Sequence, residues 1–198
     1  MNKTINLFIS LILLSALGGC ASQSSNPKSQ YYLLSSDSQS YVKETYQQVI
    51  GIKPVKVAPY INTPGIALLT RENHIRIASQ HLWAEQPDQA ITRVLHNELD
   101  QRLSNSRVDD GSLGRNSDWN YSIATQIDQF HGTETGEAVL SGHWQIKKDE
   151  QVISSYRFNL KQPLKKPGYS ALVRELQQLL SNLANQQASY LNSYLAQQ

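Results

Sequence analysis

A single cysteine, Cys20, stands in the 198-residue sequence, so no disulfide can form within the chain. A folded body must therefore be held together by its hydrophobic core alone. Neither sign of charge is in large excess, because 18 basic and 16 acidic residues give a formal charge of +2 at pH 7. This balance gives no support for nucleic-acid binding. Beyond the N-terminal leader, no segment is apolar and long enough to cross a membrane.

The N-terminus has the pattern of an export signal. Lys3 supplies a positive charge, and an almost unbroken apolar run covers residues 7–17. At about eleven residues this run is too short for a transmembrane helix, which needs roughly 20, but it suits a secretory signal. Two small residues precede Cys20, as a signal peptidase requires. We therefore predict a signal peptide over residues 1–19. The alternative is a plain secretory signal with an incidental cysteine.

The sequence Leu17-Gly18-Gly19-Cys20 resembles the lipobox of bacterial lipoproteins. In those proteins the cysteine thiol receives diacylglycerol and the new N-terminus is acylated too, which implies that Cys20 is the lipid attachment site. Two or more acyl chains make a stable membrane anchor, at about 0.8 kcal/mol per buried CH₂. Residues 20–30 are mostly small and polar, and we predict a flexible tether there with a reach of at most about 35 Å.

Residues 31–198 are predicted to form one α+β domain, a length that can bury a sizeable core. Pro87 suits the first position of a helix, and an apolar stripe at helical spacing follows it. Ser170 is the predicted N-cap of a long C-terminal helix. Both helices are expected on one face of a largely antiparallel sheet. Strands are expected over residues 31–34, 49–58 with a bulge at Pro54, 66–70, 74–78, 119–128, 138–146 and 152–160.

A search for catalytic and metal-binding motifs finds none. No pair among the five histidines has the spacing of a helical zinc site, and HExxH is missing. There is also no G-x-S-x-G, P-loop or GxGxxG pattern. We therefore predict a protein that is not an enzyme and that has no metal or cofactor. A periplasmic hydrolase is the least favoured alternative.

Tryptophan is more informative than the titratable residues. Trp119 and Trp144 alternate with polar residues on predicted strands, so core packing is their expected role. Trp83 lies between a predicted strand and the Pro87 helix. Trp83 either packs in the core and fixes the start of the helix, or it anchors an interface, a role that buried tryptophan often has.

Several short segments follow one another in a characteristic order: Val-Lys-Val-Ala-Pro-Tyr at 55–60, Ile-Arg-Ile-Ala at 75–78, Leu-Trp-Ala-Glu at 82–85, Leu-Ser-Gly-His-Trp at 140–144 and Gly-Tyr at 168–169. Together they resemble the ABC-type transport auxiliary lipoprotein family over nearly all of the chain after the leader. The segments supply candidate anchors for a partner or for packing, namely Pro59, Tyr60, Leu82 and Trp83. Many members carry Arg where Leu82 stands, so this chain does not share a contact made by that Arg.

The resemblance implies a non-catalytic component of a lipid-transport system that supports envelope integrity. The expected partner is an MCE-domain protein of the PqiB type, which forms a conduit across the periplasm that this lipoprotein would dock at the outer membrane. Ala21 after the cysteine favours outer-membrane delivery. The resemblance also implies a homo-oligomer, in the form of a ring. The alternative is a carrier that holds lipid in its own pocket, lined by residues such as Trp144, Phe158 and Leu176.

Overall fold

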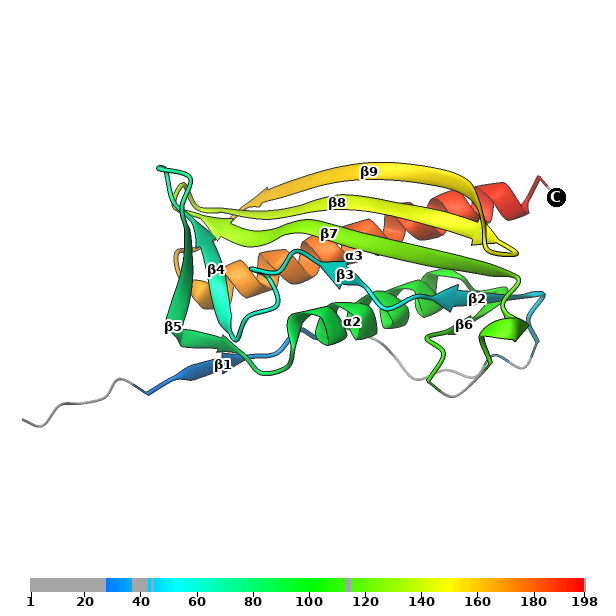
Figure 1. Ribbon diagram of the computed structural model, residues 1–198, viewed down its shortest axis with the longest axis horizontal. Coiled ribbons are helices and arrows are strands. Elements are labelled where there is room, and N and C mark those ends of the chain that lie inside the picture. The colour runs from blue at the N-terminus through cyan, green and yellow to red at the C-terminus, as the bar shows by residue number, and fades with distance from the viewer. Residues whose placement is uncertain (1–27, 37–42, 44, 113–114, 198) are drawn as a thin grey trace, which may run out of the picture.

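The chain builds one mixed sheet that is backed by helices α2 and α3 (Figure 1). The computed structural model describes residues 28–36, 43, 45–112 and 115–197. The predicted signal peptide over residues 1–19 and the predicted lipid attachment site, Cys20, lie outside the described residues. Of the predicted tether, residues 28 and 29 belong to no helix or strand, and the first strand begins at Gln30.

A long antiparallel meander forms the largest part of the sheet. It consists of β7 (Tyr121–Thr133), β8 (Glu137–Lys148) and β9 (Gln151–Pro163), paired in that order. All three strands were predicted, because residues that face the helices alternate with residues that face away. The turns use left-handed residues, with φ of 83° at Gly136 and positive φ at Asp149 and Glu150. A short 3₁₀ helix, η1 (Asn116–Asp118), precedes the meander.

Shorter strands extend the sheet on the other side of β7 and pair with it in parallel. They are β2 (Gln48–Ile52), β3 (Lys56–Val57) and β4 (Gly65–Leu69). The strand predicted over residues 49–58 is divided into β2 and β3, which pair with the same strand, β7, with one extra residue between them at the predicted bulge. Pro54 has no N–H to donate to a ladder, and the Val55 N–H bonds instead to the side chain of Thr92, at 2.9 Å.

One strand escaped prediction altogether. β6 (Ser106–Asp109) pairs in parallel with β2 at the edge of the sheet. Its sequence, Ser-Arg-Val-Asp, contains a single apolar residue, so no alternation is visible. Because the long meander contributes most of the paired residues, the sheet as a whole is largely antiparallel, as predicted.

At the end of the sheet away from β6, three strands form a wing. β5 (Ile75–Trp83) forms the predicted hairpin with β4, and β1 (Gln30–Tyr32) pairs in parallel with its last three residues. We call β1, β4 and β5 the wing. β5 extends to Trp83, beyond its predicted end at residue 78. Along residues 75–80, no strand of the described chain pairs with the outer edge of β5.

The two helices are α2 (Pro87–Arg102) and α3 (Tyr169–Leu195); in Figure 1, α3 runs behind the meander and α2 lies below it. α3 packs against β7, β8 and β9, and α2 packs against α3. The predicted N-cap at Ser170 was wrong, because Gly168 caps the helix with a φ of 106° that favours glycine. The predicted fold class is confirmed, including the long C-terminal helix. The predicted apolar stripe of the first helix is buried: Ile91, Val94, Leu95, Leu99 and Leu103.

Lys43 holds the C-terminal end of α2 from a distant part of the chain. Its ammonium group donates to the carbonyls of Asp100, Leu103 and Ser106 at 2.6 to 3.1 Å and to the Asp100 carboxylate at 2.7 Å. The last carbonyls of a helix lack intrahelical partners and carry partial negative charge, so a cation stabilises them. No local pattern in the sequence signals this contact.

Candidate docking surface

No centre for metal binding occurs in the part of the chain that the structure describes. Within that part, no group of three His, Cys, Asp or Glu side chains is placed to hold a metal ion. Of the helices described, none has both the length and the apolar character needed to span a membrane.

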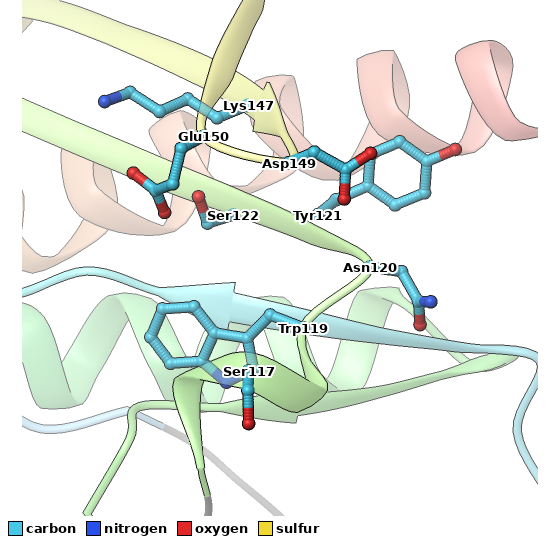
Figure 2. Close-up of a pocket in the computed structure, with 8 residues that line it drawn as sticks. All are labelled: Ser117, Trp119, Asn120, Tyr121, Ser122, Lys147, Asp149 and Glu150. Carbon is cyan, nitrogen blue, oxygen red and sulfur yellow. The ribbon is translucent and has the colours of Figure 1, made fainter.

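A polar depression lies between the start of β7 and the β8–β9 turn (Figure 2). Trp119 lines it and packs over Gly51, where a Cβ atom would lie only 2.0 Å from the indole ring. Lys53 bonds to Glu150 at 2.8 Å and lowers the pKa of that carboxyl group. The lining contains no His or Cys. The prediction of Trp119 on a strand face was wrong, since it precedes β7.

Leu82 and Trp83, two of the predicted anchors, face opposite sides of the sheet at the end of β5. Trp83 is 8% exposed, and its ring stacks against that of Phe130 with centroids 5.9 Å apart. Leu82 pairs with Tyr31 of β1 and stays partly exposed. Successive residues of a strand point to opposite faces, so Leu82 is the one of the two that a partner could contact.

Four apolar side chains lie together on the outer face of the wing, and we call them the wing patch: Tyr31, Ile75, Ile77 and Leu82. The last three pair with alternate residues of β4, which share one face, and Tyr31 pairs with Leu82. Tyr31 is 68% exposed, Ile75 37% and Ile77 39%. Large exposed apolar side chains next to an unpaired strand edge are typical of an interaction surface.

An apolar groove opens on the other side of the wing, beside the start of α3. Its volume is about 330 Å³, and Leu68, Leu164, Tyr169 and Leu172 line it. Gly132 allows α3 to approach this closely, because a Cβ atom there would lie 2.7 Å from the Leu172 side chain. The sequence did not reveal the groove, since its walls come from β4, the segment after β9 and α3.

Pro59 and Tyr60, the other two predicted anchors, follow β3. The Tyr60 ring packs against His131 of β7 with centroids 6.2 Å apart, and its hydroxyl donates to the Asp128 carbonyl at 3.3 Å. Burial raises the pKa of Tyr60, and the negative charge of Asp128 adds to the effect. Pro59 is exposed. The four predicted anchors thus lie in two separate parts of the structure, and a role for them in partner binding stays a prediction.

The residues predicted to line a lipid pocket are packed in the core. Trp144, Phe158 and Leu176 are 3%, 7% and 0% exposed. The Trp144 ring stacks on that of Tyr156 with centroids 4.4 Å apart. These side chains fill the space between the meander and α3, and the groove beside α3 is lined by other residues.

The fold and the wing can be set against known proteins. The family described as the ABC-type transport auxiliary lipoprotein component matches residues 31–188. This chain belongs to that family. Two curated relatives in the ABC-type transport auxiliary lipoprotein family are the intermembrane transport lipoprotein PqiC of Escherichia coli (strain K12) and that of Shigella flexneri. Each is 27% identical over 162 residues, which cover 81% of this chain and 83% of the relative.

Solved structures share the fold. An uncharacterized protein of 26% identity superposes with a TM-score of 0.72, covering 83% of this chain and 99% of its own. A protein from Xanthomonas campestris shares the fold at 12% identity, with a TM-score of 0.67 and the same coverage, 83% and 99%. The family match over residues 31–188 confirms the resemblance drawn from the sequence. Because members of the ABC-type transport auxiliary lipoprotein family are non-catalytic transport components, so is this chain.

Proposed function

We propose that this protein docks the periplasmic conduit of a PqiB-like MCE-domain protein at the outer membrane, as part of an intermembrane lipid-transport system that supports envelope integrity. Membership of the auxiliary lipoprotein family and similarity to PqiC support the transport role. The wing patch is the main observation in favour of docking. It exposes large apolar side chains, which are uncommon on a surface that faces only water.

The proposed anchor is a set of acyl chains on Cys20, which would leave the body facing the periplasm. β1 begins at Gln30 and belongs to the wing (Figure 1). A tether of about ten residues would therefore hold the wing within about 35 Å of the bilayer. The wing patch would then lie near the membrane, where a conduit that crosses the periplasm must end.

The proposal includes a ring of identical chains. The outer edge of β5 over residues 75–80 presents backbone N–H and C=O groups that a strand of a second copy could pair with. In this arrangement the strand edge binds a neighbouring copy, and the side chains of the wing patch bind the MCE protein. Light scattering of the purified protein would measure the number of copies, and a monomer at working concentration would contradict the ring.

Co-purification tests the docking role directly. The full-length tagged protein is expected to retain an MCE-domain protein from solubilised membranes, and a double variant, Ile75→Asp with Ile77→Asp, is expected to lose at least about 90% of it. Val152→Asp is the matched control, because Val152 is 50% exposed but lies on β9. Absence of an MCE protein with the unaltered chain would remove the proposed function. Retention by the double variant would show that docking uses another surface.

Processing of the leader tests the anchor. Replacing Cys20 by serine removes the thiol that accepts diacylglycerol, so the variant is expected to keep its leader and to take up no radioactive palmitate. The unaltered chain should be cleaved and labelled. A serine variant that is cleaved normally and recovered with membranes would disprove anchoring through Cys20.

The groove beside α3 supports a second candidate function, a carrier that holds one lipid chain. Its apolar walls, Leu68, Leu164 and Leu172, suit an acyl chain, and Arg76 at its rim could pair with a phosphate. Native mass spectrometry of the delipidated body after incubation with phospholipid would decide. One stoichiometric lipid that is lost in Leu172→Trp would favour the carrier.

A further inference from the structure

A row of polar side chains crosses the face of the sheet that points away from α2 and α3. Lys56 of β3 pairs with Gln126 of β7, Gln126 with His143 of β8, and His143 with Arg157 of β9. Cross-strand partners lie next to each other on the same face of a sheet. Four strands that are widely spaced in the sequence therefore contribute to one continuous row.

Further cations lie on the same face. Lys147 and Val139 lie four residues on either side of His143 in β8 and so share its face, and Lys161 of β9 pairs with Val139, which is itself buried. We call the resulting set the basic face: Lys56, His143, Lys147, Arg157 and Lys161. Three of these side chains are exposed, and His143 and Lys147 are partly exposed.

The basic face is hollowed between β3 and β8. A depression of about 340 Å³ is lined there by Lys53, Lys56, His143 and Lys147 together with the amide side chains of Gln126 and Gln145. No carboxylate is among its lining residues. Ammonium, imidazole and amide N–H groups thus converge on one space, and all of them donate hydrogen bonds.

Few acidic side chains lie near this face, and two of them are engaged. Glu150 bonds to Lys53 at 2.8 Å, and Asp128 accepts a hydrogen bond from Gln126 at 3.1 Å. Glu137 stands at the end of the meander, opposite Pro163. The helical side offers a contrast, because α2 and α3 together carry four acidic residues, Asp88, Glu98, Asp100 and Glu175, and three basic ones, Arg93, Arg102 and Arg174. Positive charge is therefore gathered on the sheet face of a chain that is close to neutral.

We infer that the basic face binds the phosphate groups of anionic phospholipids at a bilayer surface. Phosphate oxygens accept charge-assisted hydrogen bonds from Lys and Arg, and cations near an anionic leaflet strengthen binding additively. The cations are spread over strands about 40 Å long and about 4.8 Å apart, which matches a flat lipid surface better than one small soluble anion. The inference rests partly on the proposed anchor at Cys20, which would hold this face near a membrane.

Vesicle co-sedimentation tests the inference. The chain over residues 20–198 is produced without its leader, and hence without acyl chains; it contains every helix and strand described and the whole core. Vesicles contain either phosphatidylcholine alone or phosphatidylcholine with phosphatidylglycerol. Binding is expected only to the second kind, and is expected to disappear in 0.5 M salt because the charges are exposed to solvent. Inorganic phosphate at millimolar concentration is expected to compete poorly.

Two triple variants locate the binding surface. Lys56→Gln, Arg157→Gln and Lys161→Gln together should weaken binding on the order of 100-fold, at about fivefold for each cation removed. Arg71→Gln, Lys166→Gln and Arg174→Gln remove the same charge from exposed positions outside the basic face and should change binding less than about fivefold.

Each contrary outcome overturns the inference in a different way. Absence of binding to phosphatidylglycerol vesicles excludes a membrane role for the face. Equal losses in both triple variants show that net charge, and no particular face, attracts the protein. Strong competition by inorganic phosphate points to a site for a small anion. Since the test uses neither acyl chains nor an MCE protein, its failure leaves the proposed function standing.

Discussion

Replacing Trp83 by alanine should destabilise the protein strongly, whereas the same change at Leu82 should not. Trp83 is 8% exposed and stacks on Phe130, so its truncation opens a cavity between the wing and the meander. Removing a buried tryptophan costs about 3–5 kcal/mol, out of a total free energy of unfolding of about 5–15 kcal/mol for a typical domain. Leu82 is partly exposed, and its truncation should cost less than about 1 kcal/mol.

Urea and thermal denaturation of the chain over residues 20–198, both monitored by circular dichroism, measure the changes in free energy of unfolding and in melting temperature. At about 2–4 °C per kcal/mol for a domain of this size, Trp83→Ala should lower the melting temperature by about 6–20 °C. Trp83→Phe is the matched control, since it keeps a ring against Phe130 and should lose about 1–2 kcal/mol. Equal stabilities of Trp83→Ala and Leu82→Ala would refute the assignment of Trp83 to the core and Leu82 to the surface.

Other predictions concern features that hold the wing and the sheet in place. Lys43→Met should lower the free energy of unfolding by about 2–3 kcal/mol, because it leaves carbonyls at the end of α2 without their cation; urea denaturation checks this. Burial, followed by the charge of Lys161, lowers the pKa of His131 below its ordinary value of 6.5. The unfolded chain therefore binds a proton first, and stability should fall as the pH drops through about 6.5; His131→Gln should flatten the fall measured between pH 7.5 and 5.5. Gly142→Ala should destabilise by more than about 2 kcal/mol, since a Cβ atom would lie 2.1 Å from the Gln126 carbonyl oxygen. In Gly136→Ala the added Cβ atom would meet open space, so the variant should lose only about 1 kcal/mol of stability, because of the φ of 83°. Similar melting temperatures for Gly142→Ala and Gly136→Ala would contradict this difference.

Several parts of the candidate site could be predicted from the sequence, but their assembly could not. Leu82 and Trp83 were both predicted as anchors. That Trp83 lies in the core and Leu82 at the surface depends on the pairing of β5 with β4 and β1. Ile75 and Ile77 alternate with polar residues and were expected on a hairpin. Their place on one outer face with Leu82 follows from the register of β5 on β4, which the sequence does not show.

The sequence by itself determined the elements whose hydrophobic period is long and regular. Alternation along residues 119–160 specifies the meander, and spacings of three and four specify α2 and α3, because these periods come from backbone geometry within one segment. Only the tertiary structure decided how short segments join. Lys43 reaches the end of α2, and Lys56 enters one row with His143 and Arg157, although none of these residues is near the others in sequence. Register between distant strands is set by packing of the whole core, and no local pattern encodes it.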